Sequence, residues 1–221
     1  MIRFFDILFS GIAIIILFPL LIPVMIGLKL SGEHYIFYGQ ERVGRYGHSF
    51  KLLKFATMLK NSPNLPGGIY TSKDDPRMLP MGKFLRKTKI NELPQLFNIF
   101  VGQMSIVGYR PPLKEQYMIF PEGTKQKLYH ERPGLTGIGS IVFRNEEEIL
   151  HHFDDKDYFH RNTIIPYKVK LEDWYVEQKK IFYYFMIIII TALIVIMPNK
   201  TIWKKLLHDL PAIPDELEGY I

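Results

Sequence analysis

The sequence predicts a helix-rich α+β protein in which an N-terminal membrane helix precedes a cytosolic globular domain with short strands. Two uncharged runs support this class in a chain of 221 residues: 22 consecutive residues from Ile7 to Leu28, and 19 from Ile181 to Asn199. The 28 Lys and Arg and the 22 Asp and Glu residues all lie outside these runs. Such segregation excludes a simple soluble globule and also a transporter with many membrane spans.

The first apolar run is long enough to cross a bilayer, but Pro19 and Pro23 interrupt its second half. Each proline removes a helical N–H donor and crowds the preceding turn. Arg3 before the run and Lys29 after it set no clear direction for a crossing. We therefore predict that residues 1–32 form a re-entrant membrane anchor, with a strongly kinked span as the alternative.

The second apolar run has lysines on both sides, Lys179 and Lys180 before it and Lys200 after it. Because lysines favour the cytoplasmic face, this arrangement disfavours a single crossing. We predict an interfacial helix over residues 179–206, with membrane insertion or burial in a core as alternatives. Residues 207–221 contain proline and acidic residues, and they are expected to form a tail or a partner contact.

Residues 33–178 are predicted to form the cytosolic domain. Short apolar runs alternate with Gly44 and Gly47, which predicts a hairpin or short strands at Tyr35–Tyr38 and Ser49–Leu53. A loop at 61–76 and a helix at Arg77–Thr88 are expected to follow. A further helix is expected from about Asn91, because apolar residues recur at helical spacing between Leu93 and Val101. Pro94 suits its first turn, where a missing N–H has no cost.

Composition and motifs exclude several classes of protein. The net charge is +6 with a pI near 9.3, which favours partners that carry phosphate or an anionic membrane surface. The absence of cysteine excludes disulfides, thiolate metal sites and cysteine nucleophiles. No glycine-rich nucleotide-binding motif and no nucleic-acid recognition motif is present. Histidines and aspartates between His151 and His160 are expected to be a solvated loop, with a metal site as the alternative.

Arginines stand beside turn residues at several places, notably at Arg42, Arg110, Arg132 and Arg144. A guanidinium held on a rigid turn is suited to bidentate recognition of phosphate. The last three are spread over 35 residues, so only the fold could gather them.

Seven short motifs follow one another along the chain. They are Gln40–Gly44, Lys54–Met58, Asp75–Arg77, Gly82–Thr88, Asn91–Asn98, Met104–Pro111 and Arg132–Gly137. In this order they resemble the bacterial sugar transferases, the monotopic polyprenyl-phosphate phosphoglycosyl transferases. The resemblance runs from about Arg3 to Tyr175, which is most of the chain.

The resemblance implies transfer of a phosphosugar from a UDP-sugar to undecaprenyl phosphate, with Mg²⁺ as cofactor and UMP as the released product. It implies a location at the cytoplasmic face of the bacterial inner membrane, where this step initiates glycan or exopolysaccharide assembly. It also implies a re-entrant N-terminal helix and amphipathic helices at the membrane interface. The expected partners are the UDP-sugar, the polyprenyl phosphate and the membrane; nucleic acid is not expected, and a homo-oligomer is left open.

In the family, the chemistry rests on an Asp-Glu pair whose aspartate attacks the sugar-bearing phosphate. The corresponding pair here is Asn91-Glu92, and an amide is not nucleophilic, so the covalent mechanism cannot run through residue 91. Residue 91 could be an inactivating change, the lipid phosphate could attack directly with Mg²⁺ and Glu92, or Glu92 could become the nucleophile. Tyr109, Ala56 and Phe143 also depart from the family pattern. These departures favour a diverged, active transferase; the alternative is an inactive relative that binds nucleotide sugars or acts as a membrane scaffold.

The resemblance assigns roles residue by residue. Glu92 is expected to bind the metal or to replace the nucleophile, and Asn91 is expected to position the substrate. The candidates for phosphate binding are Arg110, Arg132, Arg144, Lys54 and Arg86. The candidates for the pocket are Gln95, Pro111, Asp173 and Tyr175, with an ordinary amphipathic helix as the alternative for the last two.

Overall fold

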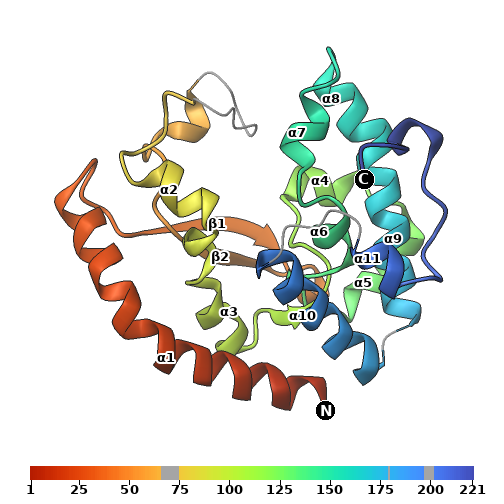
Figure 1. Ribbon diagram of the computed structural model, residues 1–221, viewed down its shortest axis with the longest axis horizontal. Helices are drawn as coiled ribbons and strands as arrows, with labels where there is room; N and C mark the ends of the chain where they lie inside the picture. The colour runs from red at the N-terminus through yellow and green to blue at the C-terminus, as the bar shows by residue number, and fades with distance from the viewer. Residues whose placement is uncertain (66–74, 179, 197–201) are drawn as a thin grey trace. The chain divides into compact units, whose positions relative to one another are not determined.

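The computed structural model describes residues 1–65, 75–178, 180–196 and 202–221 (Figure 1). The chain divides into two compact units. We call Phe4–Arg42 with Phe50–Gly102 the anchor unit, and Met1–Arg3 with Val43–Ser49 and Gln103–Ile221 the arginine unit. Helices with a few short strands make up both units, which confirms the helix-rich α+β class. The domain boundaries expected from the sequence stay predictions.

Helix α1 runs from Ile2 to Leu30 and contains both Pro19 and Pro23. Its ribbon bends part-way along its length in Figure 1, as expected where prolines remove helical hydrogen bonds. Within the described residues it is the one helix long and apolar enough to cross a membrane, and its apolar window is almost entirely unburied. Membrane re-entry stays a prediction.

The core of the anchor unit joins α1 to the predicted hairpin. Strands β1 (Phe37–Val43) and β2 (Ser49–Phe55) form a two-stranded sheet, which confirms the hairpin. The first strand starts two residues and ends five residues later than predicted, and the second ends two residues later. Leu28 of α1, Phe55 of β2 and Leu85 of α2 (Gly82–Lys87) are almost completely buried against one another.

The helix predicted at Arg77–Thr88 is wrong over its first part, because residues 77–79 pair with residues 57–59 instead. Met58 and Met78 form an antiparallel bridge, and the N–H of Leu79 donates to the carbonyl of Thr57 at 2.9 Å. A short 3-10 turn, η2 (Ser62–Asn64), follows this pairing. Most of the loop predicted at 61–76 lies outside the described residues.

The last helix of the anchor unit, α3 (Gln95–Val101), follows the 3-10 turn η3 (Ile90–Glu92). Part of its apolar stripe faces outward: Phe97, Phe100 and Val101 are exposed within this chain, whereas Leu96 is buried. The buried side also carries Asn98, whose amide accepts from the N–H of Leu53 and donates to the carbonyl of Lys51. An amide that satisfies two backbone groups of β2 thus fixes the helix.

The arginine unit is built around a parallel pair of short strands. Strand β3 (Ser105–Val107) pairs with β4 (Gly134–Thr136), with Ser105 opposite Gly134 and Val107 opposite Thr136. The helices around this pair are α4 (Lys114–Met118), α5 (Glu122–Tyr129), α6 (Ile138–Val142), α7 (Glu146–Leu150), α8 (Lys156–Phe159), α9 (Ile165–Glu177), α10 (Ile181–Ile196) and α11 (Ile202–Leu206). Three short turns complete the unit: η1 (Arg45–Gly47), the π-helical η4 (His160–Ile164) and η5 (Asp215–Leu217).

Helix α10 is buried on one side only. Tyr184, Ile187 and Ile190 are completely buried, and the hydroxyl of Thr191 lies 2.8 Å from that of Thr136 on β4. The other side of the helix exposes large apolar residues: Phe182, Ile189, Val195 and Ile196. One face of α10 therefore belongs to the core of the arginine unit. Contact of the other face with the membrane interface stays a prediction.

The C-terminal stretch packs onto the arginine unit. The hydroxyl of Tyr167 on α9 donates to the carbonyl of Pro211 at 2.9 Å, and Leu217 is completely buried. Ring contacts join Tyr220 to His152 and Phe153. Apolar and aromatic residues thus hold this stretch in place, despite its prolines and acidic residues.

Candidate functional site

Asn91 and Glu92 stand on a turn that one strained residue creates. Lys89 adopts the left-handed conformation, with φ of 60°, at the point where the chain leaves α2. Its N–H donates to the carbonyl of Arg86, and its carbonyl accepts from the N–H of Glu92 at 3.0 Å. Left-handed backbone is costly for a residue with a side chain, and such strain often accompanies functional sites.

Asn91 is buried, with 7% of its surface exposed, and its side-chain oxygen has no hydrogen-bond partner among the described residues. An unsatisfied buried polar atom costs about 1–3 kcal/mol, so its presence in a folded protein needs an explanation. The neighbouring carboxylate of Glu92 is half-buried. This turn therefore presents two oxygen-bearing side chains, one of which is unsatisfied.

The other candidates of the anchor unit come from elements around this turn. Arg86 on α2 is half-buried, and its Nη1 lies 3.7 Å from the sulfur of Met58. Lys54 on β2 is half-buried, and Gln95, the first residue of α3, is buried.

In the arginine unit, two of the turns that carry candidate arginines are bound to each other through their backbones. The N–H of Gly134 donates to the carbonyl of Tyr109 at 2.8 Å, and the N–H of Gly108 donates to the carbonyl of Thr136 at 2.9 Å. Arg110 and Arg132 flank this crossing, so the fold brings two of the three arginine-bearing turns together.

Glycine makes this crossing possible. A Cβ at Gly134 would lie 2.1 Å from the backbone nitrogen of Gly108, and a Cβ at Gly137 would lie 2.1 Å from the oxygen of Gly108. No side chain fits at these distances, because the blocking atoms belong to rigid backbone. Arg110 is exposed and Arg132 is half-buried, so rigid backbone holds two cations near the surface.

The remaining candidates of this unit lie on its helices and loops. Arg144 follows α6 and is exposed, whereas Pro111 and Tyr175 are buried. Asp173 on α9 accepts from the hydroxyl of Thr124 at 3.1 Å and pairs with Lys127 at 3.3 Å. These contacts tie α9 to α5.

One buried carboxyl, Glu172 on α9, was not expected from the sequence. It is 8% exposed, one of its oxygens has no hydrogen-bond partner among the described residues, and a Cβ at Gly139 would lie 2.6 Å from the other oxygen. Burial raises the pKa of Glu172 to about 8, against the opposing effects of Lys168 and the N–H of Gly139, while Asp173 adds to the rise. Its burial could not be predicted from the sequence, because a glutamate on an amphipathic helix is usually solvated.

A second carboxyl, Glu146, has the opposite character. Burial would raise its pKa, but the positive charge of Lys168 and hydrogen bonds from His160 and Lys168 lower it to about 2. Nε2 of His160 lies 3.0 Å and Nζ of Lys168 lies 2.7 Å from its oxygens. His160 thus contacts a carboxylate of its own unit, whereas His151 and His152 are exposed.

The donor atoms for a metal can be judged from the side chains alone. Across the described ranges, no group of three or more His, Asp or Glu residues is arranged to hold a metal ion. Mg²⁺ needs less than that, since one or two carboxylates with substrate phosphates and water complete its octahedral shell. The carboxylate of Glu92 and the unsatisfied oxygen of Asn91 fit such a partial donor set.

Comparison with known proteins finds several that are similar in sequence. Residues 1–198 match the family model described as bacterial sugar transferase. The exopolysaccharide production protein ExoY of Sinorhizobium fredii is 39% identical over 158 residues, which cover 65% of this chain and 70% of that protein. The undecaprenyl-phosphate galactose phosphotransferase of Salmonella typhimurium is 32% identical over 189 residues, covering 79% of this chain and 36% of that protein. The UDP-glucose:undecaprenyl-phosphate glucose-1-phosphate transferase of Klebsiella pneumoniae is 34% identical over 161 residues, covering 70% of this chain and 34% of that protein.

Proposed function

Because the chain belongs to the bacterial sugar transferase family, we propose that it transfers a sugar 1-phosphate from a UDP-sugar to a polyprenyl phosphate at a membrane surface. Relatives named for this reaction with undecaprenyl phosphate support the reaction class. The bent apolar helix α1 supports the membrane location, which we place at the cytoplasmic face of the inner membrane.

The observation that carries the proposal is the pair of arginine-bearing turns held together by Gly108 and Gly134. A UDP-sugar and a polyprenyl phosphate both offer phosphate oxygens, which a guanidinium on rigid backbone binds with little loss of freedom. In this proposal Arg110 and Arg132 bind substrate phosphates, as do Arg144, Lys54 and Arg86.

We propose direct transfer, because the amide of Asn91 cannot act as a nucleophile. An oxygen of the lipid phosphate attacks the sugar-bearing phosphorus of the UDP-sugar and forms a new P–O bond. The bond from that phosphorus to the bridging oxygen breaks, and UMP leaves with the electron pair. Arginine side chains stabilise the negative charge that develops on the leaving phosphate. The alternative, attack by Glu92, would give a covalent phosphosugar on the protein.

Glu92 and Asn91 are the residues that would hold Mg²⁺ together with the substrate diphosphate. When bound, the cation supplies positive charge to the diphosphate and so favours departure of UMP. The unsatisfied oxygen of Asn91 supports this role, since a carbonyl oxygen is an ordinary Mg²⁺ ligand.

The proposed function is tested by incubating the protein in nanodiscs with undecaprenyl phosphate and a panel of UDP-sugars. Release of UMP with one or more sugars, together with a radiolabelled lipid-linked product, is the expected result. An inactive relative that only binds nucleotide sugars would retain UDP-sugar and release no UMP with any member of the panel.

A further inference from the structure

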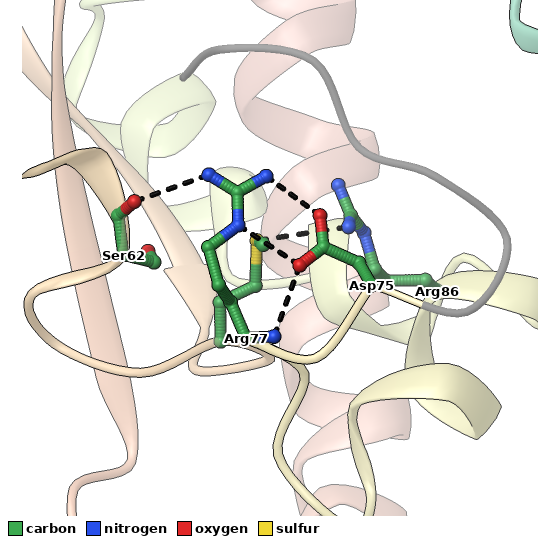
Figure 2. A network of polar contacts seen from close by, with 5 residues as sticks. Ser62, Asp75, Arg77 and Arg86 are labelled. Atoms are coloured by element: carbon green, nitrogen blue, oxygen red, sulfur yellow. Dashed lines mark hydrogen bonds and ion pairs between the residues drawn. The ribbon is translucent and has the colours of Figure 1, made fainter. Parts of the chain in front are cut away.

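Asp75 and Arg77 form a bidentate ion pair inside the anchor unit (Figure 2). Nε of Arg77 lies 2.9 Å from Oδ1 of Asp75, and Nη2 lies 2.6 Å from Oδ2. The backbone N–H of Arg77 also donates to Oδ1 at 2.9 Å. With side chains only 4% and 5% exposed, the pair is nearly removed from water.

Stability alone explains such a pair poorly. Removing two charges from water has a cost that the attraction between them often only offsets, so an apolar pair of similar size is frequently as stable. A bidentate pair of hydrogen bonds also restricts the neighbouring backbone to a single geometry.

The backbone that this pair fixes is the segment 57–62. Nη1 of Arg77 donates to the carbonyl of Ser62 at 3.1 Å, as Figure 2 shows. The carbonyl of Arg77 accepts from the N–H of Leu59 at 2.8 Å. Contacts on both sides of residue 60 thus tie the segment to Arg77.

Met58 lies within this segment and touches Arg86. Its backbone pairs with Met78, its carbonyl accepts from the hydroxyl of Tyr35, and its sulfur lies 3.7 Å from Nη1 of Arg86. A thioether is an uncharged, weak acceptor. It can therefore orient a guanidinium without neutralising the charge that a phosphate would bind.

We propose that Asp75 and Arg77 are positioning residues for phosphoglycosyl transfer, which hold Met58 where its sulfur orients the guanidinium of Arg86. The inference rests on the proposed function, in which Arg86 binds a substrate phosphate. Neither residue of the pair touches the reacting atoms.

The first test removes both charges at once. In the double variant Asp75→Asn with Arg77→Met, the asparagine keeps an oxygen for the backbone N–H at residue 77. We expect a folded protein whose KM for the UDP-sugar rises about tenfold while kcat changes less, since misplacement by about 1 Å of a binding group costs one to two orders of magnitude. A folded double variant with wild-type KM would overturn the proposal.

The second test asks whether the pair acts through Arg86. In an Arg86→Ala background, the double variant should raise KM no further, because the group that it positions is gone. A purely structural pair would give the same additional loss with or without Arg86, and that result would also overturn the proposal.

The third test does not depend on activity. Methionine ¹³C-methyl NMR in detergent, with the Met58 signal assigned from Met58→Leu, should show that signal shifted by Arg86→Ala and by the double variant. Met118 on α4 in the arginine unit is the internal control and should not move. An unmoved Met58 signal in the double variant sinks the inference, whereas absence of UMP release by the wild type would sink the proposed function and leave this measurement intact.

Discussion

The backbone N–H of Gly134 donates to the carbonyl of Tyr109 at 2.8 Å, and this bond joins the turn after Arg132 to the turn before Arg110. The approach is so close that only a residue without a Cβ fits at position 134. Two cations that are far apart in sequence are thereby held on one rigid crossing. The backbone crossing therefore sets where the two arginine-bearing turns lie relative to each other.

Gly137→Ala is expected to disturb this crossing, because the new Cβ would lie 2.1 Å from the oxygen of Gly108. We expect a fall in Tm and a decrease in kcat/KM of about 100-fold, which is typical when binding groups move by about 1 Å. Gly123→Ala on α5 is the matched control, because a Cβ at this position would have no atom within 4 Å. In this variant the free energy of unfolding should rise by up to about 1 kcal/mol, and turnover should equal that of the wild type. Equal kinetics for the two variants would contradict the crossing's role.

Lys89 is expected to tolerate glycine better than any branched residue. Its φ of 60° is left-handed, and that conformation costs a non-glycine residue about 1–2 kcal/mol. Lys89→Gly should therefore raise the free energy of unfolding by up to about 1 kcal/mol and preserve UMP release, while Lys89→Val should lower both. Lys87→Val, at an exposed position of α2, is the control and should lower the free energy of unfolding by only about 0.5 kcal/mol. Denaturant titration separates these cases, and equal costs for the two valine variants would count against a strained turn.

Glu172 is expected to make the stability of the folded protein fall as pH rises. Its folded pKa of about 8 lies above the ordinary value of 4.5, so between these pH values the unfolded state releases a proton that the folded state keeps. The stabilisation of the folded state is full below about pH 4.5 and is lost as pH rises toward 8. Glu172→Gln removes this dependence, so the Tm difference between variant and wild type should move in favour of the variant from pH 5 to pH 8. A constant difference would contradict a neutral buried carboxyl.

Glu146 provides the opposite control. Its pKa is lowered to about 2, so its contribution is present above about pH 4.5 and is lost as pH falls toward 2. Glu146→Gln should therefore lose stability at neutral pH and approach the wild type only in acid.

Phe97 is expected to bind lipid. It is 41% exposed on α3, in a row with Phe100 and Val101, which are also exposed within this chain. Phe97→Ser should weaken binding to anionic liposomes about tenfold or more, since burying a phenylalanine is worth about 1.5–3 kcal/mol. Tyr158→Ser, at a 66% exposed site on α8, is the control and should bind normally in the same flotation assay. Unchanged binding by Phe97→Ser would show that the stripe does not enter the membrane.

Local signals in the sequence predicted much of the fold. Alternation and glycines around residue 44 predicted the hairpin, and Pro19 with Pro23 predicted a bent helix. The helix after Pro94 was also predicted, because its apolar spacing and its first-turn proline are properties of the segment itself. Each of these features depends on residues that are near one another in the chain.

Features that depend on distant partners could not be predicted. Residues 77–79 look helical by themselves but pair with residues 57–59, so tertiary pairing overrides local preference. No pattern in the residues around Glu172 predicts its burial, because Gly139, on another helix, forms part of its environment.

The candidate site divides in the same way. The arginine-bearing turns were visible as local motifs, but their joining rests on a backbone approach that no spacing rule predicts. The roles of Asn91 and Glu92 came from family resemblance, whereas the unsatisfied oxygen of Asn91 became visible only in the structure.

UMP release measured with and without undecaprenyl phosphate tests direct transfer most directly. The account predicts UMP only when both the UDP-sugar and the lipid phosphate are present, and loss of this release in Glu92→Gln. A burst of about one UMP per protein without the lipid phosphate would contradict direct transfer, because it would show that a side chain such as Glu92 had accepted the phosphosugar.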